Sequence, residues 1–275
     1  MPNSLNPVAA PVSVACRLPG MPDVQRALAE VLALGDADWA PHFNSGQHNG
    51  GWHASALRAA PQSPIAESPA EYAVALYRDT SLLDRCPALR ELIESIPCEH
   101  KAIRLLRLVP GGEILEHSDP HINLRDGEAR LHLPLQTHED VFFHVRGHRI
   151  PMRTAEWWYA DFSQPHRVVN RSPQARIHLV IDCVANAWLH AALAEADSGK
   201  PHAPEADPAW QFAQFQQHVY QHQDLQERLL AARTPKDFAQ AAQQLGQSCG
   251  FGFHAAEVLS AMAAGRRTWM QQWVL

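Results

Sequence analysis

The sequence predicts an α+β protein whose central part, from about residue 101 to 185, is an antiparallel sandwich or barrel. In that part hydrophobic and polar residues alternate with period two, and the turn signals PGG, DG and RG separate the segments, as in antiparallel sheets. Before and after it, hydrophobic residues recur at helical spacing. We therefore expect N-terminal helices, a β core and a C-terminal helical module.

The N-terminal part is expected to combine loops with two helices and one strand. Residues 1–20 are rich in proline and are predicted to drape over the surface. The segment MPDVQRALAEVLAL predicts a helix that Asp23 caps. A strand, WHASALR, interrupts a loop-like stretch between residues 40 and 72, and a helix within SLLDRCPALRELIESI should stop at Pro97.

The chain divides in this reading into a β domain with its N-terminal helices (1–190), a linker (191–207) and a small three-helix module (208–275). The three helices are predicted to begin near Pro208, at Thr234–Pro235 and near Ala255, because a threonine cap followed by proline is a helix start. The predicted strands of the core are IRLLRLV, EILEHSD, ARLHLPL, VFFHV, RIPM, EWWYAD and ARIHLVIDCV.

Composition excludes several classes of function. A net charge of -6 and only three lysines argue against a nucleic-acid surface, which needs clustered cations. No apolar run reaches the roughly 20 residues that span a bilayer, and the start lacks a secretion signal, so we expect no membrane partner and a cytoplasmic location. Five scattered cysteines without a CxxC pair indicate reduced thiols rather than disulfides or a zinc knuckle.

The segment ILEHSDPH is the strongest candidate for chemistry. His117 and Asp119 are two residues apart and share one face if EILEHSD is a strand, and His166 follows 47 residues after Asp119 beside a tight turn. Two imidazoles and one carboxylate on one side of a metal leave the opposite positions open, as in non-haem Fe(II) oxygenases. The same set could hold a divalent metal for hydrolysis. The three residues are the predicted metal ligands and catalytic centre.

A second group of polar residues lies on the neighbouring strands. Arg176 and His178 share a face of ARIHLVIDCV, and Arg130 and His132 share a face of ARLHLPL. Because arginine binds carboxylates through two parallel hydrogen bonds, these cations suit a dicarboxylate cosubstrate. A structural ion pair of Arg176 with Asp161 or Asp182, and a core role for His132, are the alternatives.

Two further sets of side chains have competing explanations. Trp157, Trp158 and Tyr159 could wall a substrate pocket, but consecutive strand residues point to opposite faces, and core packing is the simpler reading. Arg104 and Arg107 precede the metal strand and could meet an anionic substrate, although a solvated strand face explains them equally well.

The motifs RLLRLVPGGEILEHSDPH, ARLHLPL, WWYADFSQPHRVVNRS and ARIHLVIDC resemble the aspartyl/asparaginyl beta-hydroxylase family of Fe(II)- and 2-oxoglutarate-dependent oxygenases. The resemblance implies a double-stranded β-helix (jelly roll) with His117 and His166 as iron ligands. It also implies that Arg176 binds the distal carboxylate of 2-oxoglutarate and that Arg130 and His132 lie near its metal-binding end.

Two departures qualify this resemblance. The animal enzyme that names the family has glycine where this chain has Asp119, whereas smaller bacterial relatives keep the carboxylate, so Asp119 looks like a third ligand. Leu106 stands where the animal enzyme supplies a serine to the cosubstrate, so that contact does not carry over. The C-terminal segment, with DLQERL and GFGFHAAEV, resembles the helical leader domain of nitrogen-fixation-linked peptide precursors, which implies a docking unit.

The expected function is therefore hydroxylation that uses Fe(II) as a cofactor and consumes 2-oxoglutarate and O2. The expected substrate is an aspartyl or asparaginyl unit, a free amino acid such as proline, or a peptidyl or carrier-tethered form, and the helical tail could dock a partner or a second subunit. Two alternatives remain open: a cupin-like metal-dependent hydrolase or isomerase, and a peptide-binding module without catalysis.

Overall fold

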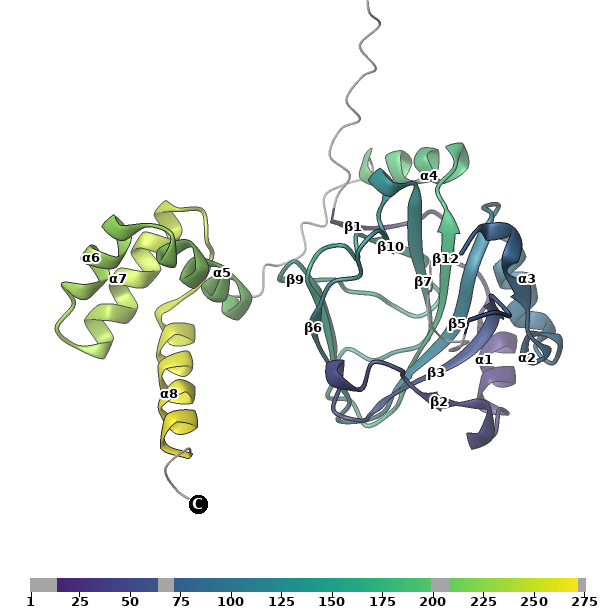
Figure 1. Cartoon of the computed structure of the whole chain (residues 1–275), viewed down its shortest axis with the longest axis horizontal. Coiled ribbons are helices and arrows are strands. Elements are labelled where there is room, and N and C mark those ends of the chain that lie inside the picture. The colour runs from purple at the N-terminus through teal and green to yellow at the C-terminus, as the bar shows by residue number, and fades with distance from the viewer. Residues whose placement is uncertain (1–13, 64–71, 199–207, 272–275) are drawn as a thin grey trace, which may run out of the picture. The chain divides into compact units, whose positions relative to one another are not determined.

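The computed structural model describes residues 14–63, 72–198 and 208–271, which form two compact units. The first is a β-sandwich flanked by the helices α1–α4, and the second consists of the helices α5–α8 (Figure 1). The predicted proline-rich loop from residue 61 lies partly outside the described residues, as do residues 1–13 of the predicted draped segment.

Two antiparallel sheets make up the sandwich, as the α+β jelly-roll prediction requires. The larger sheet has the order β1-β10-β7-β12-β5-β3-β2, with β4 paired to β3; the smaller has the order β6-β11-β8-β9. The strands of the larger sheet are β1 (Ala15–Arg17), β2 (Ala40–Pro41), β3 (Trp52–Ala59), β4 (Arg78–Asp79), β5 (His100–Leu108), β7 (Glu128–Gln136), β10 (Trp158–Ala160) and β12 (Arg176–Val184). Those of the smaller sheet are β6 (Glu113–His117), β8 (Val141–Val145), β9 (His148–Arg149) and β11 (His166–Asn170).

The larger sheet has a core on each face. Because side chains alternate along a strand, Ile177, Leu179 and Ile181 of β12 face the helices, whereas Val180 faces the smaller sheet. The inner core between the sheets includes Phe143 of β8 and Val168 of β11. Arg176 and His178 lie four and two residues from Val180 and therefore on the same inner face of β12. The sequence thus places polar groups inside the sandwich, where they need hydrogen-bond partners.

The helices cover the outer face of the larger sheet (Figure 1). They are α1 (Gln25–Leu32), α2 (Ser81–Asp84), α3 (Pro87–Glu94) and α4 (Ala187–Ser198). Asp23 lies one position before the cap residue of α1, and its carboxylate accepts a hydrogen bond from the Gln25 amide at 2.9 Å. Val31 and Leu89 are buried on the faces of α1 and α3 that pack into the shared core.

Several elements differ from the sequence prediction, and the predicted strand RIPM is not formed, because β9 ends at Arg149. The predicted draped segment contains β1, which pairs with β10 in the larger sheet, and the unpredicted strand β11 completes the smaller sheet. Helix α4 continues through Ser198, because its alanine- and leucine-rich sequence favours helix, so it overlaps the predicted linker at 191–207. The rest of that linker lies outside the described residues.

The helical module contains four helices among its described residues rather than the three predicted. They are α5 (Pro208–Tyr220), α6 (Gln223–Leu230), α7 (Pro235–Ser248) and α8 (Ala255–Gln271). The unpredicted α6 forms because Leu225 and Leu229, four residues apart, both reach the module's core. Thr234 caps α7 as predicted, and its hydroxyl accepts a hydrogen bond from the Asp237 amide at 3.1 Å.

Gly246 lets α7 approach the aromatic core of the module closely. A Cβ atom added there would overlap the ring of Phe253, which is buried. Gly246→Ala is therefore expected to destabilise the module by about 1–3 kcal/mol, the usual cost of overpacking. Hydrogen exchange of the α7 amides in the full chain measures this. Gly252→Ala is the matched control, because an added Cβ there meets no atom within 4 Å; equal exchange in both variants would contradict the prediction.

Among the described residues, no helix combines the length and apolar character that crossing a membrane requires.

Candidate metal centre

Two histidines face each other across the smaller sheet. His117, the last residue of β6, pairs directly with His166, the first residue of β11. Their ring centroids are 4.2 Å apart, and the ladder is irregular between His166 and Val168. Pairing of two chain segments that are distant in sequence therefore brings the two imidazoles together.

Asp119 joins the two histidines from a turn, not from a strand. The strand predicted over EILEHSD ends at His117, and the Asp119 amide donates to the carbonyl of Phe162 at 2.9 Å. One carboxylate oxygen lies 3.9 Å from Nε2 of His117. One nitrogen or oxygen atom from each of the three residues lies within 4.8 Å of the other two, so the predicted set does converge and could hold one metal ion.

The hydrogen bonds of both imidazoles suit metal binding. Nδ1 of His117 donates to the carbonyl of Leu115 at 2.7 Å, and Nδ1 of His166 donates to the carbonyl of Gln164 at 3.0 Å. A neutral imidazole with its proton on Nδ1 has a lone pair on Nε2, which is the form a metal needs. Burial, followed by the neighbouring His117, lowers the pKa of His166 to about 4, so this ligand is neutral at physiological pH.

A buried ionic network supports Asp119. Arg130 donates to Asp119 and also to both oxygens of Asp182, at 2.6 and 3.1 Å, and Arg104 donates to Asp182 at 2.9 Å. Burial opposes ionisation of Asp119, but Arg130 and the two imidazoles outweigh it and lower its pKa to about 2. The carboxylate is therefore charged, as a metal ligand should be.

Arg176 has no carboxylate partner among the described residues. It is 1% exposed, and Nη2 donates to Nδ1 of His178 at 2.8 Å, while the buried Nε has no hydrogen-bond partner. Asp182 binds Arg104 and Arg130 instead, so the structural ion pair that the sequence left open is not formed. Burial lowers the pKa of Arg176 to about 9, and it remains a cation at neutral pH. Burying a charge without a counter-charge costs free energy, so an anionic ligand would stabilise Arg176.

His132 lies beside this cation on the inner face of β7. Its Nδ1 is 3.2 Å from Nδ1 of His178, and its Nε2 is buried without a partner. The ring stacks on Phe162 with centroids 4.9 Å apart, and Phe162 lies equally close to the ring of His166. The sequence left open that His132 is an ordinary core histidine with both ring nitrogens hydrogen-bonded. In the described structure only Nδ1 has a partner.

Sequence reasoning missed several residues around the centre. Asp182 was considered only as a partner of Arg176, and its pairing with Arg104 and Arg130 was not foreseen. Of the two weaker arginine candidates, Arg104 points into the centre, whereas Arg107 stacks on Trp39 with 4.4 Å from its guanidinium carbon to the ring centroid. Phe162 offered no sequence signal.

The loop before β3 also contributes to the centre. The ring of His42 stacks on Trp52 with centroids 3.3 Å apart, and Trp52 lies 6.2 Å from His117 by the same measure. Nε1 of Trp52 is buried without a hydrogen-bond partner. The Trp52 ring therefore lies next to the ring of His117, with His42 stacked on it.

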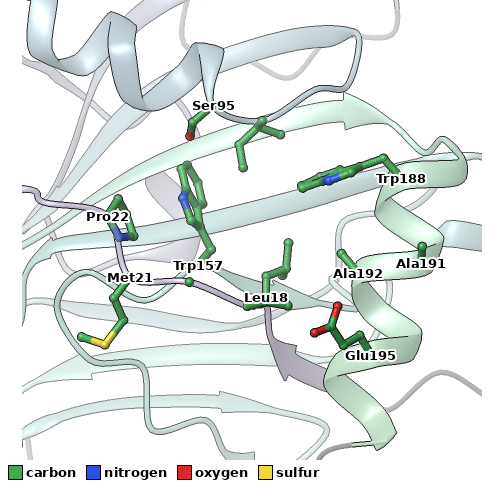
Figure 2. A pocket seen from close by; sticks show the side chains of 12 residues that line it. Leu18, Met21, Pro22, Ser95, Trp157, Trp188, Ala191, Ala192 and Glu195 are labelled. Carbon is green, nitrogen blue, oxygen red and sulfur yellow. The ribbon is translucent and has the colours of Figure 1, made fainter.

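A separate cavity of about 500 Å³ lies on the helical side of the larger sheet and contains none of the predicted site residues. Figure 2 shows the rings of Trp157 and Trp188 on its walls with Leu18 between them, and Glu195 of α4 at one side. Of the three aromatic candidates, Trp157 lines this cavity, whereas Trp158 and Tyr159 pack into the inner and outer cores. The aromatic segment therefore does not wall the metal centre as a unit.

Acid should destabilise the folded chain through its buried neutral histidines. Burial, followed by Arg104, lowers the pKa of His42 to about 3, against 6.5 for an ordinary histidine. Between these values only the unfolded chain binds the proton, so the free energy of unfolding should fall by about 1.4 kcal/mol per pH unit from this group as the pH drops below 6.5.

Urea unfolding between pH 7 and pH 4 measures this loss. In His42→Phe the slope should become shallower than in the unaltered protein. An unchanged slope in His42→Phe would contradict the assignment.

The comparison with known families decides the identity of the β domain. The aspartyl/asparaginyl beta-hydroxylase family matches residues 21–186, more than half of the chain. The chain belongs to this family. The match includes His117, Asp119, His166 and Arg176 and ends before the helical module.

The individual proteins that this chain resembles match it over part of its length or at low sequence identity. An L-proline cis-4-hydroxylase of Rhizobium meliloti (strain 1021) is 35% identical over 120 residues, which are 40% of this chain and 39% of that enzyme. The chain thus spans about two fifths of the length of this curated relative. Among solved structures, a viral collagen prolyl hydroxylase of Paramecium bursaria chlorella virus-1 has a TM-score of 0.37 and 11% identity, covering 63% of this chain and 97% of its own. An α-ketoglutarate-dependent epimerase, SnoN, has a TM-score of 0.40 and 11% identity, covering 70% and 86%.

Proposed function

We propose that this member of the family is an Fe(II)- and 2-oxoglutarate-dependent dioxygenase that hydroxylates a free amino acid. The observation that carries the proposal is the buried Arg176 cation, which has no carboxylate partner among the described residues. Arg176 lies on the face of β12 that points toward the smaller sheet, whose strands β6 and β11 carry His117 and His166, and a dicarboxylate cosubstrate would bind between the two sheets.

The residues present fit iron and this cosubstrate. His117, His166 and Asp119 would hold Fe(II), since each offers a lone pair or a charge and the three occupy one side of a metal. Arg176 would bind the distal carboxylate of 2-oxoglutarate, with Arg130 and His132 nearer the metal. Bound iron and 2-oxoglutarate would supply the activation of O2 for attack on a C–H bond.

The protein's own contribution is to position the reactants and exclude water. Arg130 holds Asp119 ionised and fixes its orientation through a direct hydrogen bond. The carbonyls of Leu115 and Gln164 hold the two imidazoles with Nε2 free for the metal. The rings of Phe162 and Trp52 pack beside His166 and His117, and such apolar surface would help to keep solvent from a reactive centre.

A small amino acid is the favoured substrate class. The relative of known activity, an L-proline cis-4-hydroxylase, supports a substrate of this class.

Succinate release from 2-oxoglutarate tests the proposal. The full chain is supplied with Fe(II), O2 and 2-oxoglutarate, and single amino acids, beginning with L-proline, are added in turn. We expect succinate in proportion to a hydroxylated product for at least one amino acid. A metal-dependent hydrolase or isomerase, or a binding module, would form no succinate with any of them.

A further inference from the structure

The side chain of Asn170 joins three segments of the chain at one end of the sandwich. Asn170 is the last residue of β11 and is fully buried. Its amide nitrogen donates to the carbonyls of Leu108 at 2.9 Å, Val109 at 3.2 Å and Gln174 at 2.8 Å. Its amide oxygen accepts from the backbone amide of Ser172 at 3.0 Å and from the hydroxyl of the same residue at 2.7 Å. Both polar atoms of this buried side chain are therefore hydrogen-bonded, as burial requires.

These hydrogen bonds lie at the point where Arg176 enters the larger sheet. Leu108 is the last residue of β5 and pairs directly with Arg176, the first residue of β12. Gln174 precedes Arg176 by two residues. The Asn170 side chain therefore ties the start of β12 to the end of β5. The guanidinium group follows this backbone, because it is buried and hydrogen-bonded to His178 of the same strand.

The other connections of Asn170 run to the smaller sheet. β11 begins at His166, four residues before Asn170, and pairs with β6, which ends at His117. The backbone of Asn170 exchanges two hydrogen bonds of 2.9 Å with the glycine turn that precedes β6. One buried residue therefore holds together the strands that carry the two histidines of the triad and the strand that carries the buried cation.

We propose that Asn170 is a positioning residue that sets the distance between the metal triad and Arg176, and thereby selects the chain length of the dicarboxylate cosubstrate. This inference rests on the proposed function, in which the cosubstrate spans the two sheets. A ligand that is held at both ends must match this span, and one methylene group too many or too few costs roughly 10- to 200-fold in a fitted pocket. Without the Asn170 amide the start of β12 would be free to shift, and a longer diacid would then fit.

The affinities for 2-oxoglutarate and for 2-oxoadipate, which is one methylene group longer, test the proposal. Calorimetry of the full chain with Zn(II) in place of Fe(II) measures the binding of each diacid without turnover. We expect the unaltered protein to prefer 2-oxoglutarate by at least about tenfold. In Asn170→Ala this preference should fall to within about threefold, because 2-oxoglutarate binds more weakly whereas 2-oxoadipate binds as well as before or better.

Two further variants distinguish positioning from a general loss of stability. Ser172→Ala removes one of the hydrogen bonds to the Asn170 oxygen and leaves those of the amide nitrogen, so it should lower the preference by a smaller factor. Asn186→Ala is the matched control. The Asn186 side chain likewise donates to a carbonyl, that of Pro97, at 2.7 Å and accepts from the Leu189 amide at 3.0 Å, but it lies beyond the far end of β12. The control should keep the preference of the unaltered protein.

Three results would overturn the role of Asn170: equal affinity of the unaltered protein for both diacids, an unchanged preference in the variants, or an equal loss of affinity for both diacids. Ser172→Ala decides the question by itself where Asn170→Ala does not fold. Failure of the unaltered protein to bind either diacid would instead refute the proposed function.

Discussion

His166→Ala is expected to abolish stable Fe(II) binding and, with it, all succinate formation. His166 supplies one of three ligand atoms that lie within 4.8 Å of one another, and its removal leaves two ligands on one side of the metal. Loss of an outer partner of a metal ligand alone weakens metal binding about 10- to 100-fold, so loss of the ligand should weaken it by at least about 100-fold. Iron content after dialysis and a titration with Fe(II) measure the effect.

His121→Ala is the matched control for this prediction. His121 lies two residues after Asp119, yet its exposed ring points to Asp126, with 3.5 Å between nitrogen and oxygen. The control should keep iron and turnover. Normal succinate formation in His166→Ala would remove His166 from the metal centre, and loss of iron in both variants would show that the region was merely unfolded.

Arg176→Leu should weaken 2-oxoglutarate binding by about 30- to 800-fold. A hydrogen-bonded charge pair contributes on the order of 2 to 4 kcal/mol when one partner is removed, and each 1.4 kcal/mol corresponds to a factor of about ten. The folded structure should not suffer, because the guanidinium is buried without a carboxylate partner and leucine removes that desolvated charge. Calorimetric titration with 2-oxoglutarate and the thermal midpoint measure the two effects.

The control for this prediction is Arg107→Leu on the adjacent strand. Arg107 packs on Trp39 instead of facing the metal triad, although β5 and β12 are direct neighbours. Its affinity for 2-oxoglutarate should stay within about twofold of the parent. An Arg176→Leu variant with unaltered cosubstrate affinity would exclude Arg176 from the binding site.

The sequence predicted most of the strands because their residues alternate between two environments. In β12, Ile177, Leu179 and Ile181 read as one buried face, and the structure places them against the helices. The alternation also placed Arg176 and His178 on the opposite face, where they are buried. Short strands were harder: β1 has only three residues, too few for a periodic pattern to stand out.

The metal triad was predicted for a reason that was only partly right. His117 and Asp119 were expected to share a strand face, but β6 ends at His117 and a turn places the carboxylate. The convergence came from strand pairing, which set His117 opposite His166. Sequence spacing indicates which residues are chemically suited to a metal, whereas pairing between distant strands determines whether they meet.

The sequence by itself determined the α+β class, the family and the residues that can bind a metal or a carboxylate, because these depend on residue types and local periodicity. Only the tertiary structure decided which charges neutralise each other. Asp182 could have paired with any of three arginines that share its face of the sheet, and the packing gave it to Arg104 and Arg130. Within the described part of the chain Arg176 was left as a buried cation without a carboxylate, because ion pairing depends on distances that only the folded sheets establish.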